Sequence, residues 1–212
     1  MSDVVMDEES IKYLVDGNWI NSIIGNGFTY NDYKNWPEDI HAEIIDGQVY
    51  LMAAPNERHS FIQNEIAYQL THYFRGKTCT VHTAKFGVRL AYEESGLDKT
   101  TVEPDIIIVC DQSIVHNKPT CQGVPDFILE IISRGESKKD LLIKKERYER
   151  AGVKEYWVVG QKHLHVFTLA NGKYLETVKE LSPDLKQPLA LFHDCVIDFQ
   201  LIADRYKDSK EY

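Results

Sequence analysis

The chain has 212 residues, with 24 basic and 33 acidic side chains and a formal net charge of -9. This length suits one folded domain, and 43% hydrophobic with 11% aromatic residues excludes a chain that is disordered over most of its length. The acidic balance argues against non-specific coating of nucleic acid, but it leaves room for a local basic site.

The sequence predicts a cytoplasmic protein with no membrane segment. No apolar run approaches the ~20 residues that span a bilayer, and the acidic residues 1–10 lack the pattern of a secretory signal. Four cysteines are present without any CxxC pair, at positions 79, 110, 121 and 195. We therefore expect neither a disulfide framework nor a zinc site, and reduced thiols are the default.

The first half of the chain predicts a short helix, a hairpin and a long helix. Residues 28–33 indicate a turn into the short helix, capped by Thr29 or Asn31. The dipeptide Asp46-Gly47 between two apolar runs is a strong hairpin signal within residues 42–52. A helix capped by Asn56 follows and closes at residues 75–76, with apolar side chains at helical spacing at positions 62, 66, 70 and 73.

Continuous apolar runs then predict central strands buried on both faces, at residues 106–109 and 127–132. Further strands are expected at 78–83, 86–92, 155–159, 164–166, 174–175 and 196–202, with a helix from Ser137 to about residue 151. This order predicts an α/β (α+β) domain with a mixed sheet rather than regular βαβ repetition. We expect one domain at residues 28–212, preceded by an extension, 1–27, that packs on the core or is partly flexible.

Two carboxylates occupy unusual places in these runs. Glu130 lies inside a buried strand, where an isolated charge costs several kcal/mol unless a cation or a proton compensates it. Asp105 follows Pro104 at the start of the other buried strand. A strand-end salt bridge for Glu130 and a turn cap for Asp105 are the structural alternatives. If the strands are neighbours, the two acids converge and could share Mg²⁺, as in a phosphodiester-cleaving site.

Lys144 lies on the helix after Glu130, on one stripe with Asp140 and Tyr148, and this stripe points to the packed side. A lysine there could orient a water molecule and offset developing negative charge. A surface pair with Asp140 is the simpler alternative, and Lys145 stays a second candidate. Residues 134–150 carry seven basic and four acidic side chains, a strip that suits a polyanion or equally a solvated helix.

Glu43 and His59 could also face this site, although single residues of this kind are more often structural. His163 and His165 share a strand face, but no third ligand with metal spacing is evident.

Taken in order, these motifs resemble the Uma-type family of restriction-endonuclease-like proteins, within the PD-(D/E)xK nuclease superfamily. The motifs are FTY with DY at 28–33, EIIDG at 43–47, Pro55 with His59, PD at 104–105, EIIS at 130–133, Asp140 with Lys144 and Tyr148, and GVKEYW at 152–157. The resemblance spans about residues 28–200.

The resemblance implies a restriction-endonuclease-like core, a mixed sheet flanked by helices, with Mg²⁺ at Asp105 and Glu130. Glu43 fits the upstream acidic position. Ile132 stands where the superfamily has its lysine, which in this family moves to the following helix, here Lys144.

The leading hypothesis is a nuclease that cleaves DNA with Mg²⁺ or Mn²⁺. Asp105 and Glu130 hold the metal, the Ile131 carbonyl can add an oxygen, and Lys144 orients the attacking water. Glu43 completes the acidic cluster, with His59 and Tyr148 in supporting places. A non-catalytic nucleic-acid-binding or regulatory module on the same fold is the main alternative, and a metal-free hydrolase is a third. A homodimer is expected by analogy alone.

Overall fold

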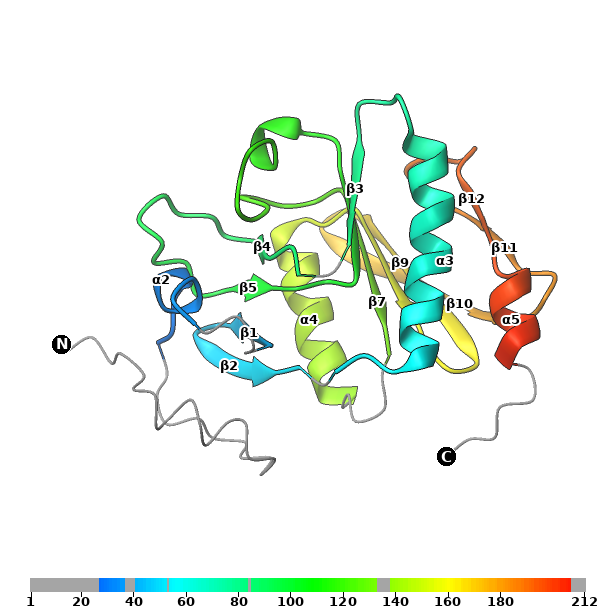
Figure 1. The fold of residues 1–212 in the computed structure, drawn as a ribbon, viewed down its shortest axis with the longest axis horizontal. Coiled ribbons are helices and arrows are strands. Elements are labelled where there is room, and N and C mark those ends of the chain that lie inside the picture. Colours follow the sequence, from blue (N-terminus) through cyan, green and yellow to red (C-terminus); the bar gives the residue numbers. More distant parts are fainter. Residues whose placement is uncertain (1–26, 37–40, 53, 84, 133–137, 207–212) are drawn as a thin grey trace.

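A six-stranded mixed sheet forms the centre of the structure, a computed structural model that describes residues 27–36, 41–52, 54–83, 85–132 and 138–206 (Figure 1). Its strand order is β10-β9-β8-β7-β6-β3. The strands are β3 (Thr80–Thr83), β6 (Ile106–Val109), β7 (Phe127–Ile131), β8 (Glu155–Val159), β9 (His163–Ala170) and β10 (Lys173–Glu180). Strands β7 and β8 run parallel and are joined by helix α4 (Lys138–Ala151), while the other neighbours are antiparallel.

The apolar runs of β6 and β7 are buried at every position, as predicted, because the sheet is covered on both faces. Ile106 and Ile108 belong to one apolar cluster, with helix α3 (Glu57–Phe74), and Ile107 and Val109 belong to the other, with α4. The alternation follows from the two-residue period of a strand.

Helix α3 confirms the prediction of a long helix capped by Asn56, whose side chain accepts a hydrogen bond from the His59 N–H. Ile62, Ile66 and Leu70 form its fully buried stripe. The same cluster includes residues of β12 (Val196–Asp198), which pairs with β11 (Lys186–Pro188), and of helix α5 (Gln200–Tyr206).

A second, four-stranded sheet has the order β2-β1-β5-β4 and packs on the α4 side of the central sheet. Its strands are β1 (Ala42–Ile45), β2 (Gln48–Leu51), β4 (Val88–Arg89) and β5 (Thr101–Val102), and the short helix α2 (Tyr30–Tyr33) precedes it. Asp46 and Gly47 both have positive φ, 53° and 79°, in the two-residue turn between β1 and β2. The hairpin prediction is confirmed, since this turn type needs positive φ at both positions.

Two predicted strands are less than half as long as the sequence suggests. The strand expected at 86–92 is reduced to β4, and the one at 196–202 ends at Asp198, after which α5 begins. The Asp198 carboxylate accepts a hydrogen bond from the Gln200 N–H, while Ile202 and Ala203 bury one face of the helix. A cap plus an apolar helical stripe outweighs the strand pattern here. Residues 1–26 of the predicted extension, and Ser137, where a helix is predicted to begin, lie outside the described residues.

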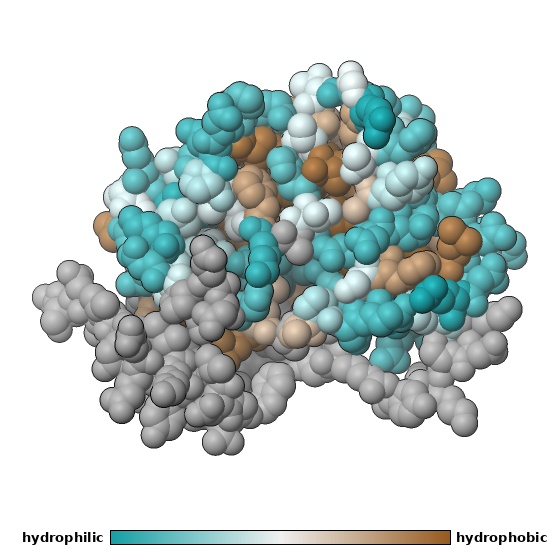
Figure 2. All heavy atoms as spheres, viewed as in Figure 1, coloured by the Kyte–Doolittle hydropathy of each residue, from teal (hydrophilic) through white to brown (hydrophobic). Residues whose placement is uncertain are grey.

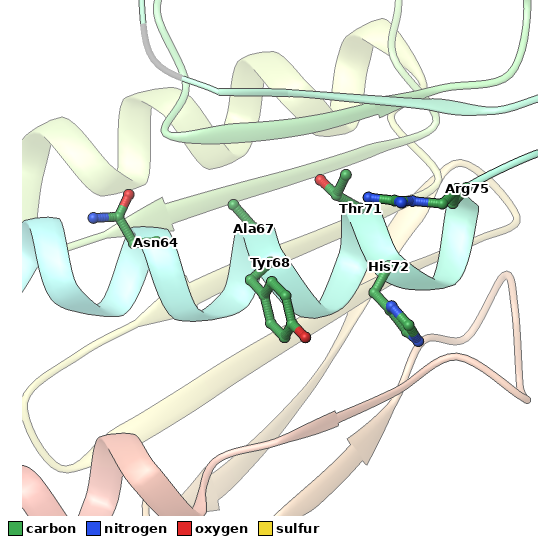
Figure 3. A pocket seen from close by; sticks show the side chains of 6 residues that line it. All are labelled: Asn64, Ala67, Tyr68, Thr71, His72 and Arg75. Atoms are coloured by element: carbon green, nitrogen blue, oxygen red, sulfur yellow. The ribbon is translucent and has the colours of Figure 1, made fainter.

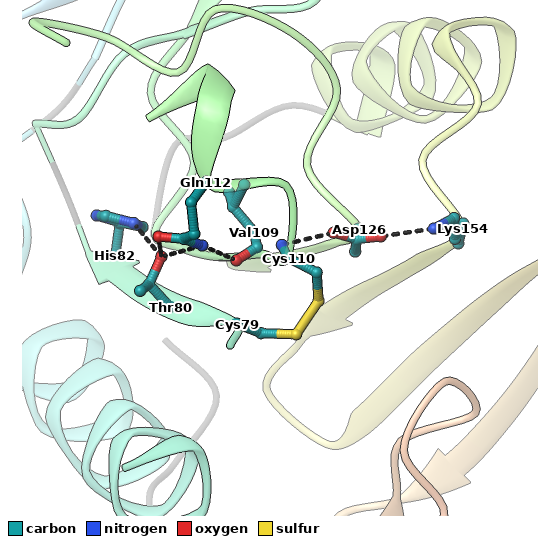
Figure 4. Close-up of a disulfide and its surroundings, with 8 residues drawn as sticks. All are labelled: Cys79, Thr80, His82, Val109, Cys110, Gln112, Asp126 and Lys154. Atoms are coloured by element: carbon teal, nitrogen blue, oxygen red, sulfur yellow. Dashed lines mark hydrogen bonds and ion pairs between the residues drawn. A yellow bond between two sulfur atoms is a disulfide. The ribbon is translucent and has the colours of Figure 1, made fainter. Parts of the chain in front are cut away.

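The expectation that the cysteines stay reduced is wrong for one pair, because Cys79 and Cys110 form a disulfide (Figure 4). Thr80 pairs with Val109 in the β3–β6 register, so the next pair outward is Cys79 with Cys110. Their separation of 31 residues gives no local signal, and only strand pairing brings them together. Cys121 and Cys195 are free and buried.

The surface shown in Figure 2 is mostly hydrophilic, with hydrophobic residues in small separate groups among the described parts. Within those parts, no helix combines the length and the apolar character that crossing a membrane would require.

Candidate active site

Lys144 brings together two strands that belong to different sheets. Its Nζ atom lies 2.9 Å from the Glu43 Oε2 atom on β1 and 3.0 Å from the Glu130 Oε1 atom on β7. All three residues are at most 5% exposed. The prediction that Lys144 points to the packed side of its helix is confirmed. The three charges are buried together, which is the arrangement that keeps buried ions from being prohibitively costly.

Helix α4 presents a second donor to the same carboxylate from one turn further on. Tyr148 is fully buried, and its hydroxyl donates to Glu130 Oε1 at 2.8 Å. Burial raises the pKa of Tyr148 well above its usual value, and the negative charges of Glu130 and Glu43 add to the shift. Tyr148 is therefore a hydrogen-bond donor at neutral pH, and with Lys144 it fixes one oxygen of Glu130.

Asp105 and Glu130 are brought together by the pairing of β6 with β7. Ile106 pairs with Leu129, so one further step of the register places Asp105 opposite Glu130. The Asp105 Oδ2 atom accepts a 2.6 Å hydrogen bond from the Ile131 N–H. The expectation that these two strands are neighbours is confirmed, and the two acids lie at one end of the pair.

Helix α3 also contacts Asp105, in addition to the β7 contact through the Ile131 N–H. The His59 Nε2 atom lies 2.9 Å from Asp105 Oδ1, and the Gln63 side-chain amide donates to the Asp105 carbonyl oxygen at 2.8 Å. His59 is 8% exposed. The sequence suggested that His59 could face the site, and the structure places it in contact with Asp105.

Glu43 is tied to the segment that carries Asp105. Its Oε1 atom accepts a 2.7 Å hydrogen bond from the Glu103 N–H, and the Glu103 carboxylate in turn accepts a hydrogen bond from the Tyr33 hydroxyl. Burial raises the pKa of Glu103, and the nearby charge of Glu43 acts in the same direction, while the Tyr33 hydrogen bond opposes them. Burial also raises the pKa of Tyr33, with Glu103 contributing.

Several residues close to the site in the sequence have contacts elsewhere. Lys145 lies 4.6 Å from the centre of the Phe167 ring, and Arg147 is bound to Asp46 in the β1–β2 turn. The basic strip of α4 is thus partly used in internal pairs. Ile132 stands at the position where the superfamily has its lysine. It packs against the apolar cluster between α4 and the central sheet. The side chain of Asp140 lies outside the described residues.

Sequence reasoning gave no place in the site to Gln63, Glu103 or Tyr33. Two of them carried a weak signal: Gln63 is four residues after His59, on the same helix face, and Glu103 is two residues before Asp105. Tyr33 belongs to the DY motif at 32–33, but nothing local predicted its contact with Glu103, because that contact spans 70 residues of chain.

The donor chemistry of this cluster fits a hard divalent cation. With the carboxylates ionised, Glu43, Asp105, Glu130 and Lys144 together have two more negative than positive charges in a buried place. Across the described residues, no group of three His, Cys, Asp or Glu side chains is arranged to hold a metal ion. Magnesium sites commonly use one or two carboxylates, with water and substrate phosphate completing the shell. The carboxylate oxygens of Asp105 and Glu130 are donors of the kind that such sites use.

A shallow pocket lies elsewhere, on the outer face of α3 (Figure 3). It is lined by Asn64, Ala67, Tyr68, Thr71 and His72 of this helix and by Arg75, which directly follows it. Tyr68 is 68% exposed, whereas Ile62 and Ile66 on the opposite stripe are fully buried. This pocket faces away from the Asp105 side of the helix, so it is separate from the candidate site.

The family model of Uma2, described as "Putative restriction endonuclease", matches residues 30–200. The chain belongs to the Uma2 family. The resemblance seen in the sequence is thereby confirmed. The match begins at α2 and ends at the start of α5, so it covers both sheets and each acidic residue of the candidate site.

A solved structure shares the fold of this Uma2 protein. It is a crystal structure of "a putative nuclease belonging to DUF820" from Anabaena variabilis, 16% identical, with a TM-score of 0.67 over 84% of this chain and 98% of that one. This likeness confirms the predicted mixed α+β fold with helices flanking the sheet.

A cryo-EM structure of a DrdV–DNA complex is far less similar: 14% identity, a TM-score of 0.34, and coverage of 56% of this chain and 10% of that one. No curated protein matches the chain.

Proposed function

We propose that this Uma2 protein is an endonuclease that hydrolyses DNA phosphodiester bonds with Mg²⁺ or Mn²⁺. The observation that carries the proposal is the buried cluster in which Lys144 lies within 3.0 Å of both Glu43 and Glu130, beside the Asp105 that β6 places opposite Glu130. The family description supports the same class of chemistry.

Asp105 and Glu130 are the residues that would hold the metal, with the Ile131 carbonyl as a further oxygen donor. When bound, such a cation supplies charge stabilisation at the phosphate and activation of water. The ammonium of Lys144 is held between two carboxylates, so it has a fixed position and can offset negative charge that develops on the phosphate. Glu43 holds that ammonium from the second sheet, and Tyr148 holds Glu130.

The experiment is cleavage of supercoiled plasmid with Mg²⁺ or Mn²⁺, with and without a chelator. The parent is compared with Asp105→Ala, Glu130→Gln and Lys144→Met. We expect each variant to cleave at least about 100-fold more slowly, the scale seen when one electrostatic partner is removed from an active site.

Glu155→Gln is the matched control. Glu155 is also a fully buried carboxylate on the sheet, but it is bound by Trp157 and by the N–H groups of Ala190 and Leu191, away from the cluster. This variant should keep the parent's rate. DNA binding without cleavage by the parent would favour the non-catalytic module instead, and cleavage that survives chelation would favour the metal-free hydrolase. Cytoplasmic location and a homodimer stay predictions.

A further inference from the structure

Helix α3 holds Asp105 at two points. His59 reaches its carboxylate and Gln63 reaches its carbonyl oxygen, at 2.9 and 2.8 Å. The two side chains are one helical turn apart and so share a face. Asn56 caps the helix by accepting the His59 N–H, and three fully buried isoleucine and leucine side chains fix the helix to the sheet. Both contacts therefore come from a rigid element.

The His59 ring has one polar partner among the described residues. Its Nδ1 atom is buried and has no hydrogen-bond partner in the part of the chain that the structure describes, while Nε2 contacts Asp105. A buried polar atom without a partner costs about 1–3 kcal/mol, so Nδ1 gives no reason for an imidazole at this position. The contact with Asp105 is what an imidazole provides here and an apolar residue does not.

We propose that His59 is a positioning residue for Asp105. In the neutral ring the proton lies on Nε2 and is donated to Asp105 Oδ1, while the Ile131 N–H is donated to Oδ2. The carboxylate plane is thereby held from both sides, and the remaining lone pairs stay available, since a carboxylate has about four acceptor positions. The inference rests on the proposed function, in which Asp105 is a ligand of the divalent cation.

The test compares His59→Gln with His59→Leu. A glutamine places an N–H donor near the former Nε2 atom, whereas a leucine fills similar space without a donor. We expect His59→Leu to weaken Mn²⁺ binding, measured by calorimetry, about 10- to 100-fold, the usual effect of removing a hydrogen-bond partner of a metal ligand. His59→Gln should stay close to the parent.

Gln69→Leu is the matched control for stability. Gln69 lies on the same helix and makes a comparable double contact, with the backbone N–H and C=O of Asp198 on β12. Its loss should lower the melting temperature about as much as the loss of the His59 donor, yet leave Mn²⁺ affinity unchanged. Unchanged affinity in His59→Leu, or equal losses in the Leu and Gln variants, would overturn the inference.

A second readout separates this inference from the proposed function. In the metal-free protein, ¹⁵N NMR of the imidazole should show the proton on Nε2, protected from exchange, and Asp105→Ala should remove that protection. If the parent binds no Mn²⁺, the nuclease proposal fails, and the NMR result still decides whether His59 holds Asp105. A proton on Nδ1 would refute the positioning role by itself.

Discussion

Glu103 is a carboxylate whose pKa is changed by its position at the border of the candidate site. It lies two residues before Asp105, accepts a hydrogen bond from the Tyr33 hydroxyl, and donates its backbone N–H to Glu43. Burial dominates its environment and raises its pKa above the usual 4.5. The folded protein therefore holds this proton more tightly than the unfolded chain does.

We predict that Glu103→Gln makes the protein more stable than the parent at neutral pH, with the gap closing in acid. Below about pH 4.5 both folded and unfolded parent are protonated at Glu103, so its contribution is constant. As pH rises through the raised pKa, ionisation of Glu103 lowers the free energy of the unfolded chain more than that of the folded protein. The free energy of unfolding of the parent therefore falls, while that of the variant does not. Urea unfolding across this pH range measures the difference.

Glu149→Gln serves as a control of opposite sign. Hydrogen bonds from the Lys173 ammonium and the Tyr174 N–H lower the pKa of Glu149, so it stabilises the fold above its unfolded pKa and this contribution is lost as pH falls. A gap between Glu103→Gln and the parent that does not change with pH would contradict the assignment.

At the scale of elements, β3 is held in the sheet both by strand pairing and by a disulfide. It pairs with β6 through four residue pairs, and the Cys79–Cys110 disulfide continues that register beyond the last pair. The other end of β6 leads to Asp105. The disulfide therefore closes a covalent loop of chain that contains both β3, the edge strand, and β6, the strand that Asp105 precedes.

We predict that reduction of this disulfide lowers the free energy of unfolding by about 2–4 kcal/mol, the typical contribution of one such crosslink. Burial raises the pKa of the free thiols, to about 12 for Cys121 and about 11 for Cys195, so neither exchanges readily at neutral pH. Urea unfolding with and without reductant measures the loss. A Cys79→Ser, Cys110→Ser double variant should be insensitive to reductant, and an insensitive parent would show that the bond does not form.

At the scale of the whole molecule, the candidate site lies where three layers meet. The central sheet supplies Glu130 and Asp105, the second sheet supplies Glu43, and α3 and α4 supply His59 and Lys144 from opposite faces. No single element contains the site, so it forms only when the domain is complete.

We predict that residues 27–212 fold without the preceding segment. Gly27 and Phe28 donate backbone hydrogen bonds to the Gly47 carbonyl, and Phe28 is buried, so this contact ties the chain around residue 28 to the β1–β2 turn. The described residues of both apolar clusters all come after this point. Calorimetry should give one cooperative transition within a few degrees of the full chain. A fragment without a cooperative transition would place residues 1–26 inside the domain.

The sequence by itself determined the features that depend on short-range pattern. The buried runs of β6 and β7, the Asp46-Gly47 turn, the cap of α3 and the inward stripe of Lys144 and Tyr148 follow from local periodicity and turn chemistry. Glu130 was recognisable because a charge inside an apolar run must have a partner. At Asp198–Gln200 the local pattern misled, because the same apolar residues suit a strand or a helix.

Only the tertiary structure decided which distant residues meet. The contacts of Lys144 with Glu43, His59 with Asp105, Tyr33 with Glu103 and Cys79 with Cys110 each join segments at least 31 residues apart. Strand order and register set these contacts, and neither is written in any short stretch of sequence. The physical reason is that long-range pairing is chosen by the burial of both sheet faces at once, which depends on the whole chain.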